Sequence, residues 1–291
     1  MILVAGATGQ LGRLITRTLM EQGKPVRILV RTGSSYDELV AAGAQPVTGD
    51  LKDPRSLRAA CAGVTAILTT ANSMGRGGDD TVESVDRVGN RNLVEAAVAE
   101  GVRRFVFTSV LGADPESVAP FIRAKGETEQ RLRDSALAWT ALQPDAFMDT
   151  WVPAVVGGPA LAGQPVTVVG DGLRRHTFVA VRDVAAYAVA ALDRRDAEGR
   201  ALPIGGPQAL TWGDIVDVFE QELGRPVGLR TVPPGQPVPG MPDFAAELLA
   251  MLNTYDSDVD STDLASSFGV TPTPVAEFVR SLVAAHHQHA G

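Results

Sequence analysis

The sequence has 291 residues, 45% of them hydrophobic, with 34 acidic and 26 basic side chains and a formal charge of −8. This hydrophobic fraction supports a buried core and excludes a disordered chain. Nucleic acids and anionic membranes attract clustered cations, so the acidic balance argues against both as partners. The single cysteine, Cys61, excludes an internal disulfide framework. No segment approaches the about 18 apolar residues of a membrane span, and we expect a cytoplasmic protein.

Short β-branched runs alternate with helical patterns through the first half of the chain. Strands are predicted at residues 1–5, 25–30, 45–49, 66–70, 103–109 and 139–143, and helices near 10–22, 35–42, 54–61, 80–100 and 120–136. Parallel strands need crossover connections, and right-handed crossovers place helices on both faces of the sheet. The pattern therefore predicts an α/β fold with a doubly wound parallel sheet of the Rossmann type, whose ligands bind beyond the carboxyl ends of the strands.

The pattern changes after about residue 150. Glycine and proline become more frequent, strands become sparse, and helical patterns return at 182–194, 212–224, 242–253 and 274–286. We predict that residues 1–150 form the Rossmann domain. Residues 151–291 are predicted to form a smaller, mostly helical substrate lobe that packs with the first domain as one unit.

The stretch GATGQLG, residues 6–12, lies between the first predicted strand and the first predicted helix. Gly6 permits a tight turn, Gly9 lets the backbone approach a pyrophosphate, and Gly12 lets the helix pack on the strand. Bound phosphates would meet free amides and the positive end of the helix. The spacing is GxxGxxG rather than the commoner GxGxxG. In this context it predicts a dinucleotide site formed by Gly6, Thr8, Gly9, Gln10, Leu11 and Gly12.

The residue that ends the second predicted strand indicates which dinucleotide binds. An Asp or Glu there would bind the adenosine ribose and repel a 2′-phosphate. This sequence has Arg31 instead, followed by hydroxyl residues that include Ser34. A fixed cation beside hydroxyl donors suits a phosphate, so NADP(H) is favoured over NAD(H). Asp50 and Leu51 follow the third strand, where the Asp50 carboxylate accepts from the adenine amino group or simply closes a turn.

Several segments of the sequence resemble the atypical short-chain dehydrogenases/reductases, in particular their NmrA-like NAD(P)-binding group. These segments are VAGATGQLG, VRILVR, TGDLKD, VGNRNLVEAA, RRFVFTSVLGAD, KGETEQRLRDSALAWTALQPDAFM and HTFVAVRDVAAYAVAAL. The resemblance implies a Rossmann fold, NADP(H) binding, and either small-molecule reduction or redox sensing. It also implies cofactor contacts at Thr70, Ala71, Thr108, Lys125, Pro144 and Phe147, and a substrate pocket near Asp145, Met148 and Trp151.

The resemblance fails at one catalytic position. Active members of the wider superfamily carry a Ser and a Tyr-xxx-Lys pair, in which the Tyr hydroxyl protonates the substrate and the Lys lowers its pKa. Here Phe121 stands four residues before Lys125, and we predict that it lines the substrate pocket. Ser109 matches the superfamily serine, and a lysine at the position of Lys125 is itself the acid/base in some atypical relatives. His176 is a further candidate proton donor in the substrate pocket, the alternative being a structural histidine.

The sequence leaves three functions open. The favoured one is an NADPH-dependent oxidoreductase that transfers hydride to a small apolar carbonyl, enone, quinone or imine. The second is a non-catalytic NADP(H)-sensing regulatory protein that binds a protein partner. The third is a redox-neutral isomerase, dehydratase or cyclase on the same scaffold. No HExxH, paired cysteines or GxSxG occurs, so no metal and no acyl transfer are predicted. Whether the chain forms a homodimer stays open.

Overall fold

The computed structural model describes residues 1–290, apart from the side chains at 243, 244, 289 and 290. The chain forms two compact units, each made of two segments. The first unit comprises Met1–Pro144 and Val184–Pro203, and the second comprises Asp145–Asp183 and Ile204–Gly291. This division differs from the predicted single boundary at residue 150, because the last strand of the first unit's sheet comes from the sequence after that boundary.

The first unit is built on a seven-stranded sheet in the order β3-β2-β1-β4-β5-β6-β8. Its strands are β1 (Ile2–Ala5), β2 (Val26–Val30), β3 (Gln45–Thr48), β4 (Ala66–Thr69), β5 (Arg104–Thr108), β6 (Ala138–Pro144) and β8 (Arg200–Ile204). The neighbours from β3 to β6 are paired in parallel, with Val4 of β1 beside Ile28 of β2 and Leu68 of β4. The strand order reverses at β1, which places a ligand-binding switch point at its carboxyl end. The predicted doubly wound sheet is confirmed, and β8 is the strand that sequence analysis missed.

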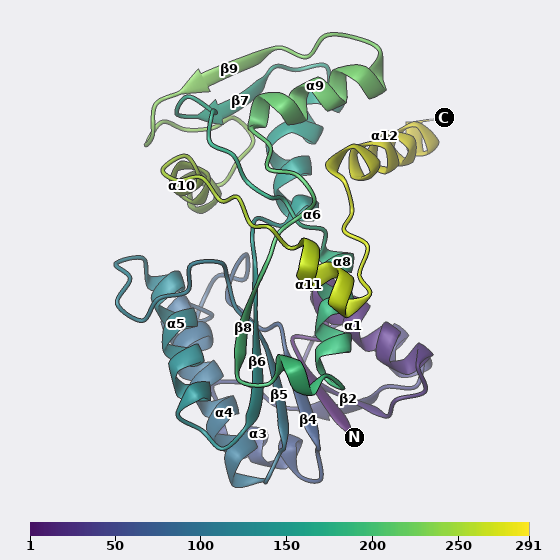
Figure 1. Ribbon diagram of the computed structural model, residues 1–291, viewed down its shortest axis with the longest axis vertical. Coiled ribbons are helices and arrows are strands. Elements are labelled where there is room, and N and C mark those ends of the chain that lie inside the picture. The colour runs from purple at the N-terminus through teal and green to yellow at the C-terminus, as the bar shows by residue number, and fades with distance from the viewer. Residues whose placement is uncertain (291) are drawn as a thin grey trace. The chain divides into compact units, whose positions relative to one another are not determined.

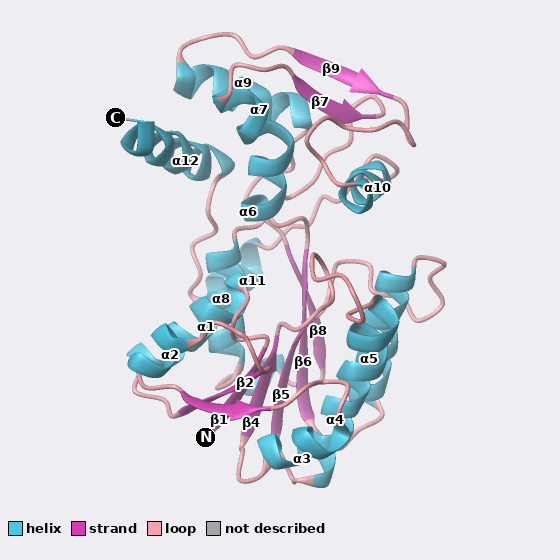
Figure 2. Ribbon diagram, turned by 180° about the vertical axis from the view of Figure 1, so that it is seen from behind, coloured by secondary structure: helices cyan, strands magenta, loops and turns pink. Residues whose placement is uncertain are grey.

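Helices cover both faces of this sheet. The helices of the first unit are α1 (Gln10–Glu21), α2 (Asp37–Ala41), α3 (Pro54–Cys61), α4 (Asn90–Ala99), α5 (Pro120–Arg133) and, from Val184 on, α8 (Val181–Ala191). Figures 1 and 2 show α3, α4 and α5 along one face and α1 and α8 along the other. Alternate strand residues face the α3–α5 side, among them Leu3, Ala5, Phe105 and Phe107, and they join the buried core there.

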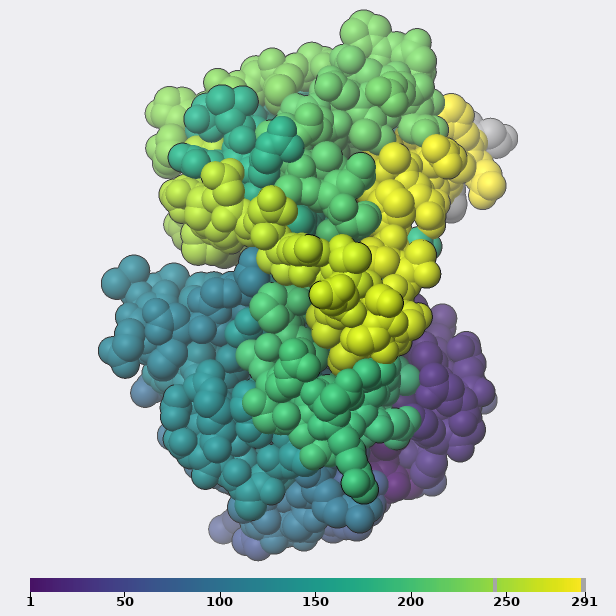
Figure 3. Space-filling view, viewed as in Figure 1, coloured from purple at the N-terminus to yellow at the C-terminus, as the bar shows by residue number. Residues whose placement is uncertain are grey.

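Two features of the first unit departed from expectation. The predicted helix at 80–100 begins as a π-helical segment, η1 (Val82–Gly89), and continues as α4. The segment Val184–Pro203 returns to this unit, and its green atoms lie between the teal and purple surface of the earlier chain in Figure 3. The segment carries η3 (Arg195–Ala197) and β8, and the buried Arg104 guanidinium binds it by donating to the carbonyl of Ala191.

The second unit is mostly helical. Its elements are α6 (Met148–Trp151), η2 (Val152–Gly157), α7 (Gly158–Leu161), the parallel pair β7 (Val166–Val169) and β9 (Leu229–Val232), α9 (Trp212–Leu223), α10 (Asp243–Leu252), α11 (Thr262–Phe268) and α12 (Val275–Ala290). Helix α9 begins at a capping box, in which Thr211 and Asp214 each accept the other's backbone amide, and it ends at the left-handed Gly224. Apolar residues of α6, η2, β7, α9 and α12 form this unit's own core.

Candidate cofactor and active site

The glycine turn after β1 is shaped by two positions that exclude a side chain. Gly6 has φ +83°, and a Cβ there would lie 2.6 Å from Oγ1 of Thr70 and 2.9 Å from the amide nitrogen of Ala71. A Cβ on Gly12 would lie 2.1 Å from the carbonyl oxygen of Gly6. Because neither glycine has a side chain, the start of α1 can lie this close to β1 and to the residues after β4. This is the geometry that the predicted roles of Gly6 and Gly12 require.

Gly9 has a different environment from the other two glycines. Its amide donates to the carbonyl of Gly6 at 3.0 Å, and a Cβ on Gly9 would lie 3.4 Å from that same carbonyl oxygen, an ordinary contact. It is the exposed N-cap of α1, and no side chain caps the helix. The first turn, with exposed Gln10 and buried Leu11, therefore directs its amides and the positive end of the helix dipole outward at Gly9, which suits a pyrophosphate.

A pocket opens from this turn along the carboxyl ends of β1 to β4. Its empty volume is about 460 Å³, counting the part that is open to solvent. The pocket is lined by Gly6, Thr8, Leu29, Arg31, Ser34, Gly49, Asp50, Leu51, Ala71, Arg76, Asp80 and Val85. Seven of the predicted cofactor residues thus share one cavity. The sequence analysis did not predict Arg76 or Asp80, which come from the loop between β4 and η1.

The pocket is strongly charged at the end of β2. The Asp80 carboxylate accepts from Nη1 of Arg31 and, at 2.7 Å, from Nζ of Lys52, and Nη1 of Arg76 lies 3.8 Å away. The Lys52 hydrogen bond, followed by the pairing with Arg31, holds the pKa of Asp80 below its ordinary value. Asp50 accepts the backbone amide of Lys52 at 2.8 Å, so its carboxylate closes a turn while also lining the pocket.

The buried lysine of α5 lies beyond β5. Lys125 is 2% exposed, and its Nζ donates to the carbonyl of Thr108 at 3.1 Å. The rings of Phe107 and Phe121 lie 4.9 and 5.3 Å from the same nitrogen. Burial lowers the pKa of Lys125, while the carboxylates of Asp86 and Glu129 act in the opposite direction.

Asp86 is the acidic partner of this lysine, and it was not predicted. It belongs to η1, is fully buried, and its Oδ1 lies 3.8 Å from Nζ of Lys125. Oδ2 accepts from the amide and the hydroxyl of Ser73 at 3.0 and 2.6 Å. Within the described part of the chain, Oδ1 of Asp86 and Oδ1 of Asn90 have no hydrogen-bond partner. π-Helical turns are frequent at functional sites, but their position cannot be read from composition.

Ser109 is bound into a buried network. Its hydroxyl donates to Oε1 of Glu129 at 2.5 Å, and Nε2 of Gln143 donates to the same oxygen at 2.9 Å. Oε2 of Glu129 accepts from Arg133 at 3.3 Å. The serine proton is directed at a carboxylate, so this arrangement leaves Ser109 as an acceptor. It does not favour Ser109, the match to the superfamily serine, as a proton donor.

His176 and Asp145 are part of one interior network of the second unit. His176 is 1% exposed, with Nδ1 2.7 Å from the hydroxyl of Ser257 and Nε2 2.9 Å from the carbonyl of Leu252. Asp145 accepts from Ser257 at 2.6 Å and from the amide and hydroxyl of Thr177, each at 2.9 Å. Both predictions are corrected here: the two side chains are occupied structurally, and neither is available to a substrate.

The remaining predicted residues differ in burial. Met148 is fully buried in the core of the second unit, so its assignment to a pocket wall is corrected. Phe147 and Phe121 are half-buried, Trp151 packs partly against the core of its unit, and Pro144 is buried at the end of β6. Thr70 donates to the carbonyl of Gly6 at 3.3 Å.

None of the described helices is long and apolar enough to cross a membrane, and the described residues hold no group of three or more His, Cys, Asp or Glu that fits a metal ion.

The class of protein follows from three features: the doubly wound sheet, the uncapped glycine turn at its switch point and the buried lysine of α5. Together they define a dinucleotide-binding oxidoreductase of the short-chain type. The sequence profile described as NAD(P)H-binding matches residues 6–195, and the chain belongs to this family. This confirms the predicted atypical, NmrA-like group and its fold. The chain is an NAD(P)H-dependent oxidoreductase, and its cofactor is a nicotinamide dinucleotide.

Three relatives illustrate this family. The chain is 35% identical to an NAD(P)H azoreductase of Xenophilus azovorans over 230 residues, which cover 78% of this chain and 75% of the relative. The structure of the present chain is similar to that of an NADPH-dependent quinone oxidoreductase of Escherichia coli complexed with NADPH, with a TM-score of 0.82 and 25% identity. The match covers 97% of this chain and 100% of the quinone oxidoreductase. The triphenylmethane reductase of Citrobacter sp., complexed with NADP(H), gives the same four values.

Proposed function

We propose that this protein is an NADPH-dependent reductase of small conjugated acceptors, such as quinones, enones, imines or azo compounds. The observation that carries the proposal is the pairing of Phe121 with Lys125, whose ammonium lies 5.3 Å from a ring that has no hydroxyl. Simple ketones need a proton as the hydride arrives, because an isolated alkoxide is a poor product. Conjugated acceptors give a delocalised anion, so they tolerate a site without the usual tyrosine.

The preference for NADPH rests on the charges of the pocket. Arg31, Lys52 and Arg76 place three cations around a single carboxylate, Asp80. A guanidinium binds a phosphate through several charge-assisted hydrogen bonds, which a ribose hydroxyl cannot match. The fit supports a 2′-phosphate at this end of the pocket, with Asp50 and Leu51 beside the adenine and the amides at Gly9 on the pyrophosphate.

The nicotinamide supplies the hydride when the cofactor is bound. Lys125 would then bind ribose hydroxyls through Nζ and hold the proton that the reduced acceptor takes up, since burial lowers its pKa and eases proton release. Phe121 and Phe107 keep water from that nitrogen.

The experiment is a substrate panel followed by absorbance of the reduced nicotinamide. Wild-type protein should oxidise NADPH with quinones and azo dyes and not with simple ketones. Lys125→Met should lower that turnover by about 10²-fold or more while NADPH still binds. Phe121→Tyr restores the missing hydroxyl and should add ketone reduction. Tight NADPH binding with no turnover on any conjugated acceptor would refute the proposal.

A further inference from the structure

Asp80, a charged residue of the cofactor pocket, has no role in the predicted site. Asp80 ends the loop that joins β4 to η1, and its side chain is 8% exposed. Three cations converge on it from three separate segments: Arg31 at the end of β2, Lys52 after β3, and Arg76 in its own loop. The segments are distant in sequence, so the carboxylate is the common point that joins them.

We propose that Asp80 is a positioning residue that holds these three cations as a cradle for the 2′-phosphate of NADPH, and so determines the preference for NADPH over NADH. The inference rests on the proposed NADPH-dependent function. It assigns to Asp80, Lys52 and Arg76 a role in cofactor selection that Arg31 alone was predicted to have.

The three cations have more N–H donors than Asp80 can use, so the carboxylate does not block them from binding a phosphate. Asp80 takes a hydrogen bond from one nitrogen of Arg31, and a guanidinium has five N–H donors. Lys52 gives Asp80 one bond at 2.7 Å and has three donors, and Arg76 lies near the carboxylate at 3.8 Å. Donors therefore remain on each cation for a second anion.

Charge balance points to the same ligand. Asp50 also belongs to the cluster, because its carboxylate lies 3.9 Å from Nζ of Lys52, so three cations and two carboxylates leave a net charge of +1. A phosphate monoester, which carries about −1.5 to −2 at neutral pH, is attracted to this positive charge, whereas a ribose hydroxyl leaves it uncompensated. Without Asp80, three cations would repel one another and separate before a phosphate arrived.

The loop that carries Asp80 cannot fix these positions by itself. Gly75, Gly77 and Gly78 all have φ between +61° and +75°, and a Cβ on any of them would meet open space. Three glycines in four residues give a backbone with many accessible conformations. The ion pairs of Asp80 with Arg31 and Lys52 tie the loop to the rim of the pocket, while a backbone bridge between Gly77 and Asp80 closes a turn within the loop.

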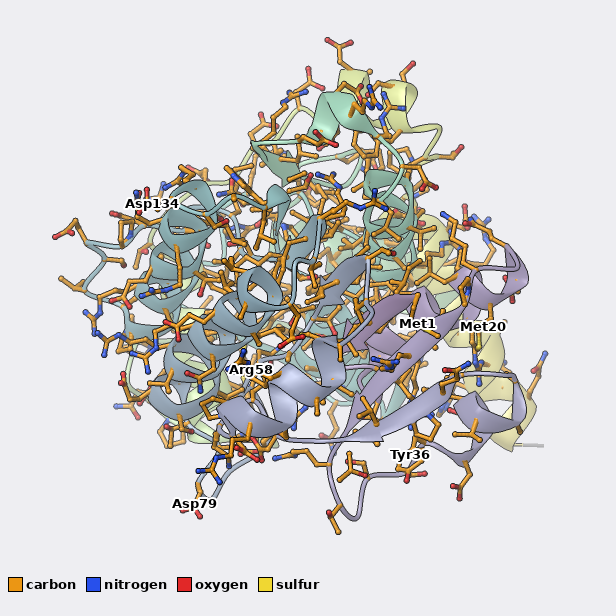
Figure 4. The ribbon with its side chains drawn as sticks, turned by 90° about the horizontal axis from the view of Figure 1, so that it is seen from below. Met1, Met20, Tyr36, Arg58, Asp79 and Asp134 are labelled. Atoms are coloured by element: carbon orange, nitrogen blue, oxygen red, sulfur yellow. The ribbon has the colours of Figure 1, made fainter. Side chains whose placement is uncertain are left out.

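The test compares Asp80→Asn with Asp79→Asn. Asp79 is the adjacent carboxylate, exposed and directed outward at the periphery in Figure 4, so its variant makes the same change in net charge outside the cluster. Binding of NADPH, NADH, adenosine 2′,5′-bisphosphate and adenosine 5′-monophosphate is measured by titration calorimetry. Asp80→Asn should weaken both 2′-phosphorylated ligands by about tenfold and the other two by less than about twofold. Asp79→Asn should change none of them.

The outcomes separate this role from the proposed function. Wild-type protein that binds NADH as tightly as NADPH would refute both. A wild-type preference for NADPH that persists or increases in Asp80→Asn would refute the positioning role alone, as would an equal loss for all four ligands. If Asp80→Asn does not fold, Lys52→Gln and Arg76→Gln replace it, since both side chains are about one-third exposed at the rim. Each should then lower the NADPH preference, and unchanged preference in both would overturn the cradle.

Discussion

Oδ1 of Asp86 lies 3.8 Å from Nζ of Lys125, and the two side chains are 0% and 3% exposed. The carboxylate is anchored through its other oxygen by Ser73, so the free oxygen faces the ammonium in a fixed position. A buried ammonium loses hydration, and a nearby anion offsets part of that loss. Asp86 therefore opposes the lowering of the Lys125 pKa by burial.

We expect Asp86→Asn to lower the pKa of Lys125 further, because the anion that opposes desolvation is lost. The asparagine oxygen can still accept from Ser73, so the local fold survives, at a cost of about 3 kcal/mol in free energy of unfolding. If Lys125 donates the proton, the alkaline limb of the rate–pH profile should move to lower pH. Glu83→Gln is the control, since Glu83 is on the same η1 segment but is 62% exposed. An alkaline limb in the same place for both variants would contradict the pairing.

The lowered pKa of Lys125 also predicts a pH dependence of stability. The unfolded chain binds a proton at the ordinary lysine pKa of 10.5, above the value in the folded state. Between those two values the unfolded state holds more protons, so the free energy of unfolding rises with pH across that window. The free energy of unfolding of the wild type minus that of Lys125→Met, measured by urea unfolding, should therefore increase as the pH rises toward 10.5. A constant difference would exclude a depressed pKa.

Ser109→Ala should mainly affect stability. The variant removes a 2.5 Å hydrogen bond to the buried Glu129 carboxylate, which Gln143 and Arg133 still bind. A hydrogen bond to a charged group contributes about 1.5–3 kcal/mol, and we expect a loss in that range by chemical denaturation. Quinone turnover should stay within about threefold, since the serine proton is donated to Glu129 and is not free for a substrate. A loss of 10²-fold at unchanged NADPH affinity would restore Ser109 as the proton donor.

The sheet and the cofactor loop were predictable because they depend on local sequence. Alternation of β-branched runs with helical stripes indicated six of the seven strands, and Gly6 and Gly12 have geometric roles that only glycine meets. The seventh strand, β8, is separated from the others in the sequence by the second unit's first segment. Its pairing depends on distant residues, and no local pattern indicates such a return.

The residues that sequence analysis missed or misplaced depend on side-chain partners. Asp80 and Asp86 look like ordinary acids of a loop and an amphipathic helix, and only folding brings Lys52 or Lys125 to them. His176 looked available because a lone histidine titrates near neutral pH. Its two ring nitrogens are instead occupied by Ser257 and the carbonyl of Leu252, partners about 80 residues further on.

His176→Phe should destabilise the second unit without affecting the cofactor. The phenyl ring keeps the edge contacts with Phe178 and Tyr255 but leaves the Leu252 carbonyl without its donor. One buried unsatisfied group costs about 1–3 kcal/mol in free energy of unfolding. NADPH affinity should stay within about twofold, because the lining of the pocket belongs to the first unit. Loss of turnover at full stability would instead indicate a catalytic histidine.

Gly9→Ala and Gly12→Ala form a matched pair for the cofactor turn. A Cβ on Gly12 would lie 2.1 Å from the carbonyl oxygen of Gly6, so this variant must displace α1 and should lose both stability and NADPH binding. A Cβ on Gly9 would lie 3.4 Å from the carbonyl oxygen of Gly6, and the φ of −79° at Gly9 is open to alanine, so the free energy of unfolding should change by less than about 0.5 kcal/mol. The added methyl group nevertheless stands where the pyrophosphate approaches the amides, and NADPH affinity should fall by about 10²-fold. Thermal unfolding and calorimetric titration of both variants measure the two effects separately. Full NADPH affinity in Gly9→Ala would place the pyrophosphate elsewhere.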